Sequence, residues 1–383
     1  MTTAQGREQI LTNGRIVTAD AEFDGTVVVR DGLIVEVSPG RSCANAIDLE
    51  GDYLVPGLVE LHTDNMEKHF APRPGVQWPS MAAVMAHDTQ IAAAGITTVF
   101  DSLSLGDVRG DTDRVKNRAR MVEAICAVSE RRLSRAEHRL HLRCEVTPDD
   151  AVDAVDQWID LPLVGLISIN DHTPGQRQFL DPAKLKQYYM GKFLMTEEQF
   201  EAFHARSMEL HGRNAEKHRR EIVSRAQARA LPLASHDDAT RAHVAEAVEN
   251  GMTIAEFPTT REAAEASREG GLAVLVGAPN LVLGGSHSGN VSARHLAAEN
   301  LVDGLASDYV PMSLVQACLL FHETMGMGLP EAVATVTAAP ALMVGLGGRG
   351  EVAVGLRADL AWIRAYDHMP VVRGVWREGI RVV

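Results

Sequence analysis

The sequence has few cysteines, few aromatic residues and no long hydrophobic run, and each absence excludes a class of protein. Of 383 residues, four are cysteine and 5% are aromatic. The cysteines lie far apart in the chain, which excludes a disulfide framework and a CxxC zinc site; they are Cys43, Cys126, Cys144 and Cys318. No run of about 18 apolar residues occurs, and the start MTTAQGREQI lacks the segments of a secretory signal. We therefore expect a cytoplasmic protein with reduced thiols.

The chain also has fewer basic than acidic residues. The chain has 37 basic and 51 acidic residues, which gives a formal net charge of −14. Such a charge argues against nucleic acid or an anionic membrane as the main partner. An anionic small-molecule substrate would need a local group of cationic side chains, backbone N–H groups or metal. A homo-oligomer is compatible with the sequence, which does not decide the oligomeric state.

Both ends of the chain have a pattern typical of β-structure. Residues 8–50 contain short alternating or apolar runs separated by Asn-Gly, Asp-Gly and Pro-Gly, which are turn signals. The same pattern returns only from Asp359 to the end of the sequence. We therefore expect residues 1–55 and 347–383 to form one bipartite β-sandwich domain.

The middle of the chain, residues 56–346, alternates short apolar runs with longer amphipathic stretches. The strand-like runs are LVELHTD, GITTVFD, RLHLRCE, VGLISIND, ALPLASHDD, GMTIAEFPTT, LAVLVGAPN and LASDYVP. Eight such units predict an α/β fold of the TIM-barrel type, a (β/α)8 barrel. A doubly wound open sheet is the structural alternative. No GxGxxG or GxxxxGK[ST] follows an early strand, so the phosphate-binding loop of such a sheet lacks support.

Polar side chains stand at the carboxyl end of nearly every predicted strand. They are His62 and Asp64, Asp101, Glu145, Asp171 and His172, His236 with Asp237 and Asp238, Glu256, Asn280, and Asp308. A closed barrel brings all its strand ends to one mouth, where the active sites of this fold are found. Capping of the following helix would explain any one of them, Asp101 in particular. Capping does not explain the whole series.

His62 and Asp64 are two residues apart on a predicted strand, which directs both side chains to one face. An imidazole and a carboxylate together suit Zn²⁺, Mn²⁺ or Fe²⁺, and the lack of nearby cysteines argues against a structural zinc site. We therefore predict a catalytic divalent metal.

These features resemble the amidohydrolase superfamily. The resemblance is carried by the split β domain, by V-P-G-L-V-E before an HxH-like pair, by a His after the fifth strand and by an Asp after the eighth. Longer segments such as ELHTDNMEKHF, DHTPGQRQF and GGSHSGN resemble its branch in phosphonate catabolism. It implies one or two metal ions held by residues at the barrel mouth: His62, Asp64, Glu145, His236, Glu256 and Asp308. It also implies that Asp308 accepts the proton of the attacking water.

The chain departs from the superfamily pattern at three positions. Asp64 replaces the second imidazole of HxH, the usual strand-four lysine is absent, and Glu256 stands where His is usual. Glu145 is then the candidate bridge between two metals. Alternatively, Glu145 forms a salt bridge with Arg139 or Arg143, and Glu256 caps the next helix.

A second group of residues is expected to face the substrate. Cations near strand ends are Lys68, Arg73, Arg143, Arg177, Lys192 and Arg261. Arginine suits bidentate contact with phosphate, and Gly-rich turns present backbone N–H groups to anions. We favour Arg177 and His287, which lie in such turns, followed by His172, Lys68 and Arg73.

The resemblance implies a hydrolase that cleaves the triphosphate of a ribose 1-methylphosphonate 5-triphosphate and releases diphosphate. A carbon-centred amidohydrolase, such as a deaminase or an N-deacetylase, is the alternative, because fold alone does not separate the two. A catalytically inactive barrel with an assembly role would be expected to have lost its metal ligands. Here His62, Asp64, His236 and Asp308 are all present.

Overall fold

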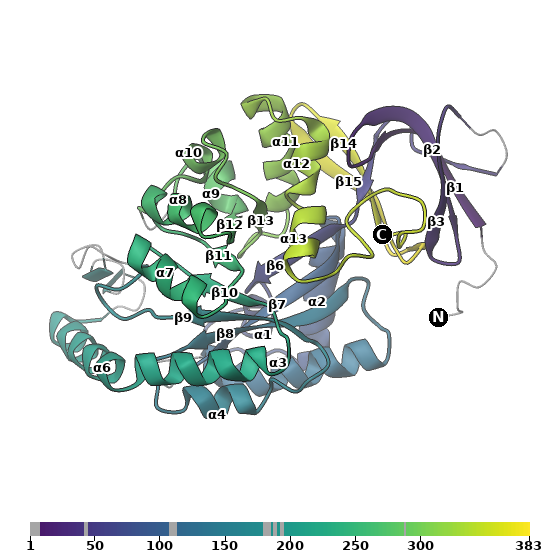
Figure 1. Ribbon diagram of the computed structural model, residues 1–383. Helices are drawn as coiled ribbons and strands as arrows, with labels where there is room; N and C mark the ends of the chain where they lie inside the picture. Colours follow the sequence, from purple (N-terminus) through teal and green to yellow (C-terminus); the bar gives the residue numbers. More distant parts are fainter. Residues whose placement is uncertain are drawn as a thin grey trace. The chain divides into compact units, whose positions relative to one another are not determined.

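The structure is a computed structural model that describes residues 8–41, 45–106, 113–178, 185–186, 190–191, 195–286 and 289–383. Its strands form two sheets (Figure 1). Cys43, Lys192 and His287 lie outside the described residues. The other three cysteines are free thiols. Within the described part of the chain, no helix is long and apolar enough to cross a membrane.

The first sheet is built from both ends of the chain, as predicted. Its order is β16-β15-β14-β5-β1-β2-β3, and β4 also pairs with β1. N-terminal strand β5 pairs antiparallel with C-terminal strand β14, which joins the purple and yellow ends of Figure 1. The strands are β1 (Glu8–Val17), β2 (Glu22–Arg30), β3 (Leu33–Pro39), β4 (Ile47–Asp48), β5 (Tyr53–Pro56), β14 (Leu360–Tyr366), β15 (Met369–Arg377) and β16 (Ile380–Arg381).

The core of this sheet explains why its two ends depend on each other. Leu11 and Val27 from the N-terminal strands share one buried cluster with Leu360, Trp362 and Trp376 from the C-terminal strands. Burying apolar surface is the main favourable term in folding. Neither end of the chain could bury its apolar face alone, so the two are expected to fold together.

One predicted turn is a bulge instead. Asp31-Gly32 joins β2 to β3 with both residues at positive φ, as a two-residue hairpin requires. Asn13-Gly14, by contrast, lies inside β1, where the pairing with β2 shifts register. A Cβ at Gly14 would lie 2.5 Å from Leu49 Cδ1. Glycine is therefore needed there for close packing against the chain.

The second sheet contains eight parallel strands, and the prediction of a (β/α)8 barrel is confirmed. Their order follows the chain, from β6 to β13. The first and last strands also meet, through a parallel bridge between Thr63 and Asp308. The strands are β6 (Leu58–Thr63), β7 (Ile96–Leu105), β8 (Glu137–Glu145), β9 (Val164–Asn170), β10 (Leu233–His236), β11 (Ile254–Glu256), β12 (Ala273–Gly277) and β13 (Gly304–Ala306).

Helices separate these strands along the chain. Thr196, Thr240 and Thr260 cap three of them, each accepting a backbone N–H bond with its side chain. The helices are α1 (Glu67–Phe70), α2 (Ser80–Ala93), α3 (Asp113–Glu130), α4 (Ala151–Asp156), α6 (Glu197–Gln227), α7 (Arg241–Glu249), α8 (Arg261–Glu269), α9 (Ala278–Leu283), α10 (Ala293–Ala298), α11 (Ser313–Met325), α12 (Leu329–Ala334) and α13 (Ala338–Met343).

The chain divides into two compact units. The first contains Met1–Asp101, Met121–Arg139 and Gly304–Val383, and the second contains Ser102–Arg120 and Leu140–Asp303. The first unit therefore holds the terminal sheet together with β6 and β13, and the second holds β9 to β12. The domain boundaries near residues 55 and 347 stay a prediction.

Candidate metal centre and substrate site

In the first unit, backbone hydrogen bonds hold the ends of β6 and β13 together. The Asp308 N–H donates to the His62 carbonyl (2.9 Å), and the Asp64 N–H donates to the Asp308 carbonyl (3.1 Å). The Thr63 hydroxyl donates to the same Asp308 carbonyl (2.7 Å). Asp308 has a left-handed backbone, with φ of 54°. Three of the predicted metal ligands, His62, Asp64 and Asp308, thus lie on two segments of backbone that hydrogen bonds hold together.

The side chain of Glu60 adds hydrogen bonds to the same two segments. Its side chain is fully buried and accepts the N–H of His62 on one oxygen and the N–H of Ser307 on the other, both at 2.7 Å. Burial raises the pKa of Glu60 to about 8, although these donors favour the ionised form. The sequence interpretation missed Glu60. The signal was a lone carboxylate in the apolar run LVELHT, two residues before His62.

In the second unit, four polar side chains gather at or just past the ends of β8, β9 and β10. His172 Nδ1 lies 2.5 Å from Glu145 Oε2, and its Nε2 lies 3.8 Å from Asp237 Oδ2. His236 Nδ1 lies 2.9 Å from the same oxygen of Asp237. Ligand atoms of His172, His236 and Asp237 all lie within 4.8 Å of one another. Asp237, which the sequence interpretation left without a role, belongs to this group.

Among the described residues, Glu145 does not form the salt bridge with arginine that was considered as an alternative. In the described part of the chain its partner is His172, rather than Arg139 or Arg143. Burial would lower the pKa of His172, but the neighbouring Glu145 carboxylate outweighs it and raises that pKa. Glu145 and His172 thus form one charged pair at the end of β8.

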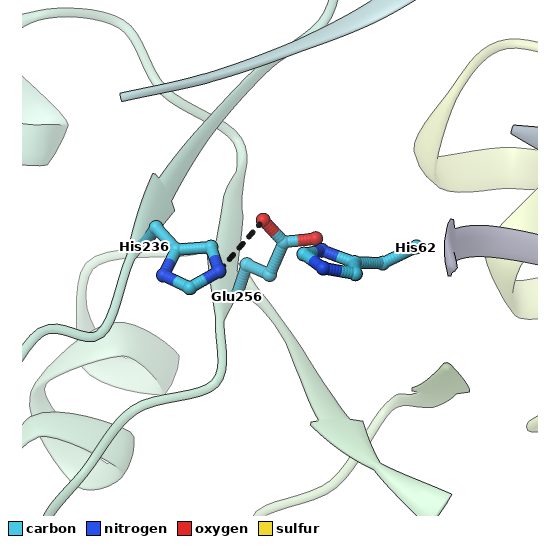
Figure 2. Close-up of side chains that lie close together, drawn as sticks. All are labelled: His62, His236 and Glu256. Carbon is cyan, nitrogen blue, oxygen red and sulfur yellow. Dashed lines mark ion pairs between the residues drawn. The ribbon is translucent and has the colours of Figure 1, made fainter. Parts of the chain in front are cut away.

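Glu256 ends β11 and faces His236. Its Oε2 lies 3.8 Å from His236 Nε2, as Figure 2 shows. His62, also drawn in Figure 2, comes from β6 in the other unit. Glu256 does not cap the following helix, because Thr260 does so. A carboxylate that is 1% exposed and faces an imidazole is a suitable metal ligand.

Arg177 is surrounded by carboxylates. Its guanidinium contacts Asp238, and its Nη2 lies 2.5 Å from Glu246 Oε2. Arg219 from α6 pairs with the same Glu246. Arg177 is 4% exposed. Both sides of the guanidinium already have anionic partners, which favours a structural role for Arg177, and its contact with polyphosphate stays a prediction.

Three of the other predicted cations, Lys68, Arg73 and Arg261, are on the surface. Lys68 on α1 and Arg73 after it are both exposed. Arg261 at the start of α8 pairs with Glu265 and Glu299, which makes it a surface residue. Asn280 lies in α9, where its side chain bonds Val291 and Ala293. Of these, Lys68 and Arg73 stay predicted substrate contacts.

Asp101 lies in the middle of β7, not at its end, and neither caps a helix nor joins the site. Its oxygens bind His87 Nε2 and His138 Nδ1, each at 2.7 Å. His138 Nε2 also lies 3.3 Å from Asp88, which accepts the N–H of Arg135. Both ring nitrogens of His138 thus face carboxylates, so the ring is positively charged. Asp88, Asp101, His87 and His138 are buried.

This buried network predicts how stability depends on pH. Burial opposes charge, but the neighbouring charges raise the pKa of His138 to about 9 and lower that of Asp101 to about 2. A raised histidine pKa stabilises the fold fully below its unfolded value near 6.5, and this stability is lost as the pH rises through 9. The Asp101 contribution is lost as the pH falls from about 4 through 2. Urea unfolding between pH 2 and 10 should show both losses; a His138→Gln variant that keeps the alkaline loss would contradict the assignment.

Comparison with known proteins places the chain in a family. It is 44% identical over 376 residues to α-D-ribose 1-methylphosphonate 5-triphosphate diphosphatase of Escherichia coli (strain K12), covering 97% of this chain and 100% of that protein. No protein-family model matches the chain.

Solved structures agree on the fold. An amidohydrolase has a TM-score of 0.61 at 17% identity, covering 98% of this chain and 99% of that one. The 5-methylcytosine deaminase of Klebsiella pneumoniae has a TM-score of 0.64 at 14% identity, covering 98% of each chain. With its near-full-length match to the Escherichia coli protein, the chain belongs to the family of α-D-ribose 1-methylphosphonate 5-triphosphate diphosphatases.

Proposed function

We propose that this protein is a metal-dependent diphosphatase of phosphonate catabolism. Its substrate would be α-D-ribose 1-methylphosphonate 5-triphosphate, and its products diphosphate and ribose 1-methylphosphonate 5-phosphate. The observation that carries this proposal is the 44% identity over the whole length of the Escherichia coli enzyme of that name. The fold alone does not decide between phosphorus and carbon as the centre attacked.

We propose six ligands for one or two divalent metal ions, Zn²⁺, Mn²⁺ or Fe²⁺. They are His62, Asp64, Glu145, His236, Glu256 and Asp308. Each lies within two residues of the end of a barrel strand, and the strand ends of a closed barrel share one edge. The donor set of imidazole nitrogens and carboxylate oxygens fits these ions. His172 and Asp237 are close enough to His236 to contribute as well.

In this proposal, a bound metal supplies Lewis-acid polarisation of the phosphoryl oxygen and a lower pKa for water. Asp308 accepts the proton of the attacking water. A new P–O bond forms to the water oxygen, the bridging P–O bond breaks, and diphosphate leaves with the bonding electrons. Lys68, Arg73, His172 and His287 are the proposed contacts to the substrate. We further propose the cytoplasm as the site of action, since a phosphorylated sugar is an intracellular metabolite.

The test is a substrate panel on protein depleted of metal and then reloaded. The ribose triphosphate, nucleoside triphosphates, N-acyl compounds and aminopurines should be offered in parallel, with products followed by ³¹P NMR and by release of ammonia or acetate. We expect diphosphate from the ribose triphosphate only with the reloaded protein. Ammonia or acetate release without diphosphate would instead establish a carbon-centred reaction.

A further inference from the structure

Arg143, which is partly buried, differs from the buried arginines of the second unit. It lies on β8 two residues before Glu145, so the two side chains share a face of the strand. His141, two residues earlier on this face, bonds Ser168 of β9. Side chains on this face of β8 therefore lie beside those of the neighbouring strand β9. The same face carries both Arg143 and a proposed metal ligand.

The guanidinium of Arg143 lies beside His236. Its Nη2 is 3.5 Å from His236 Nε2, at the outer limit for a hydrogen bond. Its Nε is buried and has no hydrogen-bond partner. Arg143 also forms no ion pair with a carboxylate among the described residues. Burying an N–H donor such as this Nε without an acceptor is costly.

Two other arginines of this unit, Arg177 and Arg219, have carboxylate partners within the fold. Arg177 contacts two carboxylates, Asp238 and Glu246, and Arg219 contacts Glu246. Their charges are balanced within the fold. Among the described residues, no carboxylate lies within ion-pair distance of Arg143, and a planar guanidinium matches a phosphate oxygen pair better than any other side chain does.

We propose that Arg143 is a catalytic residue that donates hydrogen bonds to the substrate's phosphoryl group attacked by water. This rests on the proposed function, because a metal held by His236 would place that phosphoryl group beside Arg143. Donors aimed at developing negative charge stabilise a phosphoryl-transfer transition state. The assignment deepens the proposed site with a cation that is neither a metal ligand nor a surface residue.

The experiment compares Arg143→Ala, Arg143→Lys and the control Arg220→Ala. Arg220 lies on α6, where its exposed side chain pairs only with Glu216 among the described residues. Metal content, steady-state kinetics with the ribose triphosphate, and binding of inorganic diphosphate by calorimetry should be measured for each. We expect Arg143→Ala to lower kcat/KM by about 10- to 150-fold per lost charged hydrogen bond and to weaken diphosphate binding.

Arg143→Lys should fall between wild type and Arg143→Ala, because lysine keeps the charge but loses the bidentate geometry. Added methylguanidine should partly restore Arg143→Ala and leave Arg220→Ala unchanged. Wild-type kinetics in Arg143→Ala, or loss of its metal, would overturn the assignment. If that variant does not fold, wild-type kinetics in Arg143→Lys would overturn it equally. Arg143-dependent diphosphate binding without turnover of the ribose triphosphate would instead refute the proposed function and leave the phosphate contact standing.

Discussion

Asp308→Asn is expected to reduce kcat by about 10²- to 10⁴-fold, the usual contribution of a general base. The amide cannot accept the proton of the attacking water, and as a neutral group it also weakens a metal site. The fold should survive, because the backbone bonds of Asp308 to His62 and Asp64 do not involve its side chain. Asparagine also tolerates the left-handed backbone found here.

Asp367→Asn is the matched control for Asp308→Asn. Asp367 also has a left-handed backbone, with φ of 47°, but it lies in the exposed turn between β14 and β15. We expect this control to keep full activity and full metal content. Steady-state kinetics, metal analysis and thermal unfolding should be measured on both variants. Full turnover by Asp308→Asn would show that another group accepts the proton.

Arg177→Ala is expected to lower the free energy of unfolding by about 3 to 5 kcal/mol, as for other buried pairs that lose one partner. The substitution leaves Asp238, which is 1% exposed, without its cation. The charge of Glu246 stays balanced, because Arg219 still contacts it. Urea unfolding measures the change.

Arg213→Ala is the control for Arg177→Ala. Arg213 contacts Asp149 on the surface, where ion pairs contribute about 0 to 1 kcal/mol. A stable Arg177→Ala protein whose kcat/KM alone falls would support the substrate contact predicted from the sequence.

Local sequence patterns predicted the fold well because they act over short distances. Buried apolar runs such as LVELHT mark the barrel strands, and Thr196 and Thr260 mark helix starts. The same patterns failed where a contact over long separation decides the outcome. Asn13-Gly14 reads as a turn until Leu49, far along the chain, packs against it.

The site shows the same limit. The strand-end position of His62, His236 and Glu256 could be predicted, since the end of an apolar run is visible in the sequence. The partners of Arg177 could not, because Asp238 and Glu246 lie 61 and 69 residues away. Asp101 was misplaced for a related reason: β7 continues to Leu105, and the side chain is held by histidines from other elements.

Glu60 has a consequence for how the barrel forms. One of its two hydrogen bonds is local, to His62, and the other joins the first barrel strand to Ser307, 247 residues later in the chain. Contacts of such long sequence separation form late, because the intervening chain must first lose its freedom. The amide proton of Ser307 should therefore become protected from hydrogen exchange only when the barrel closes. In a refolding protein this amide would report the closing step directly, separately from the earlier formation of individual strands and helices.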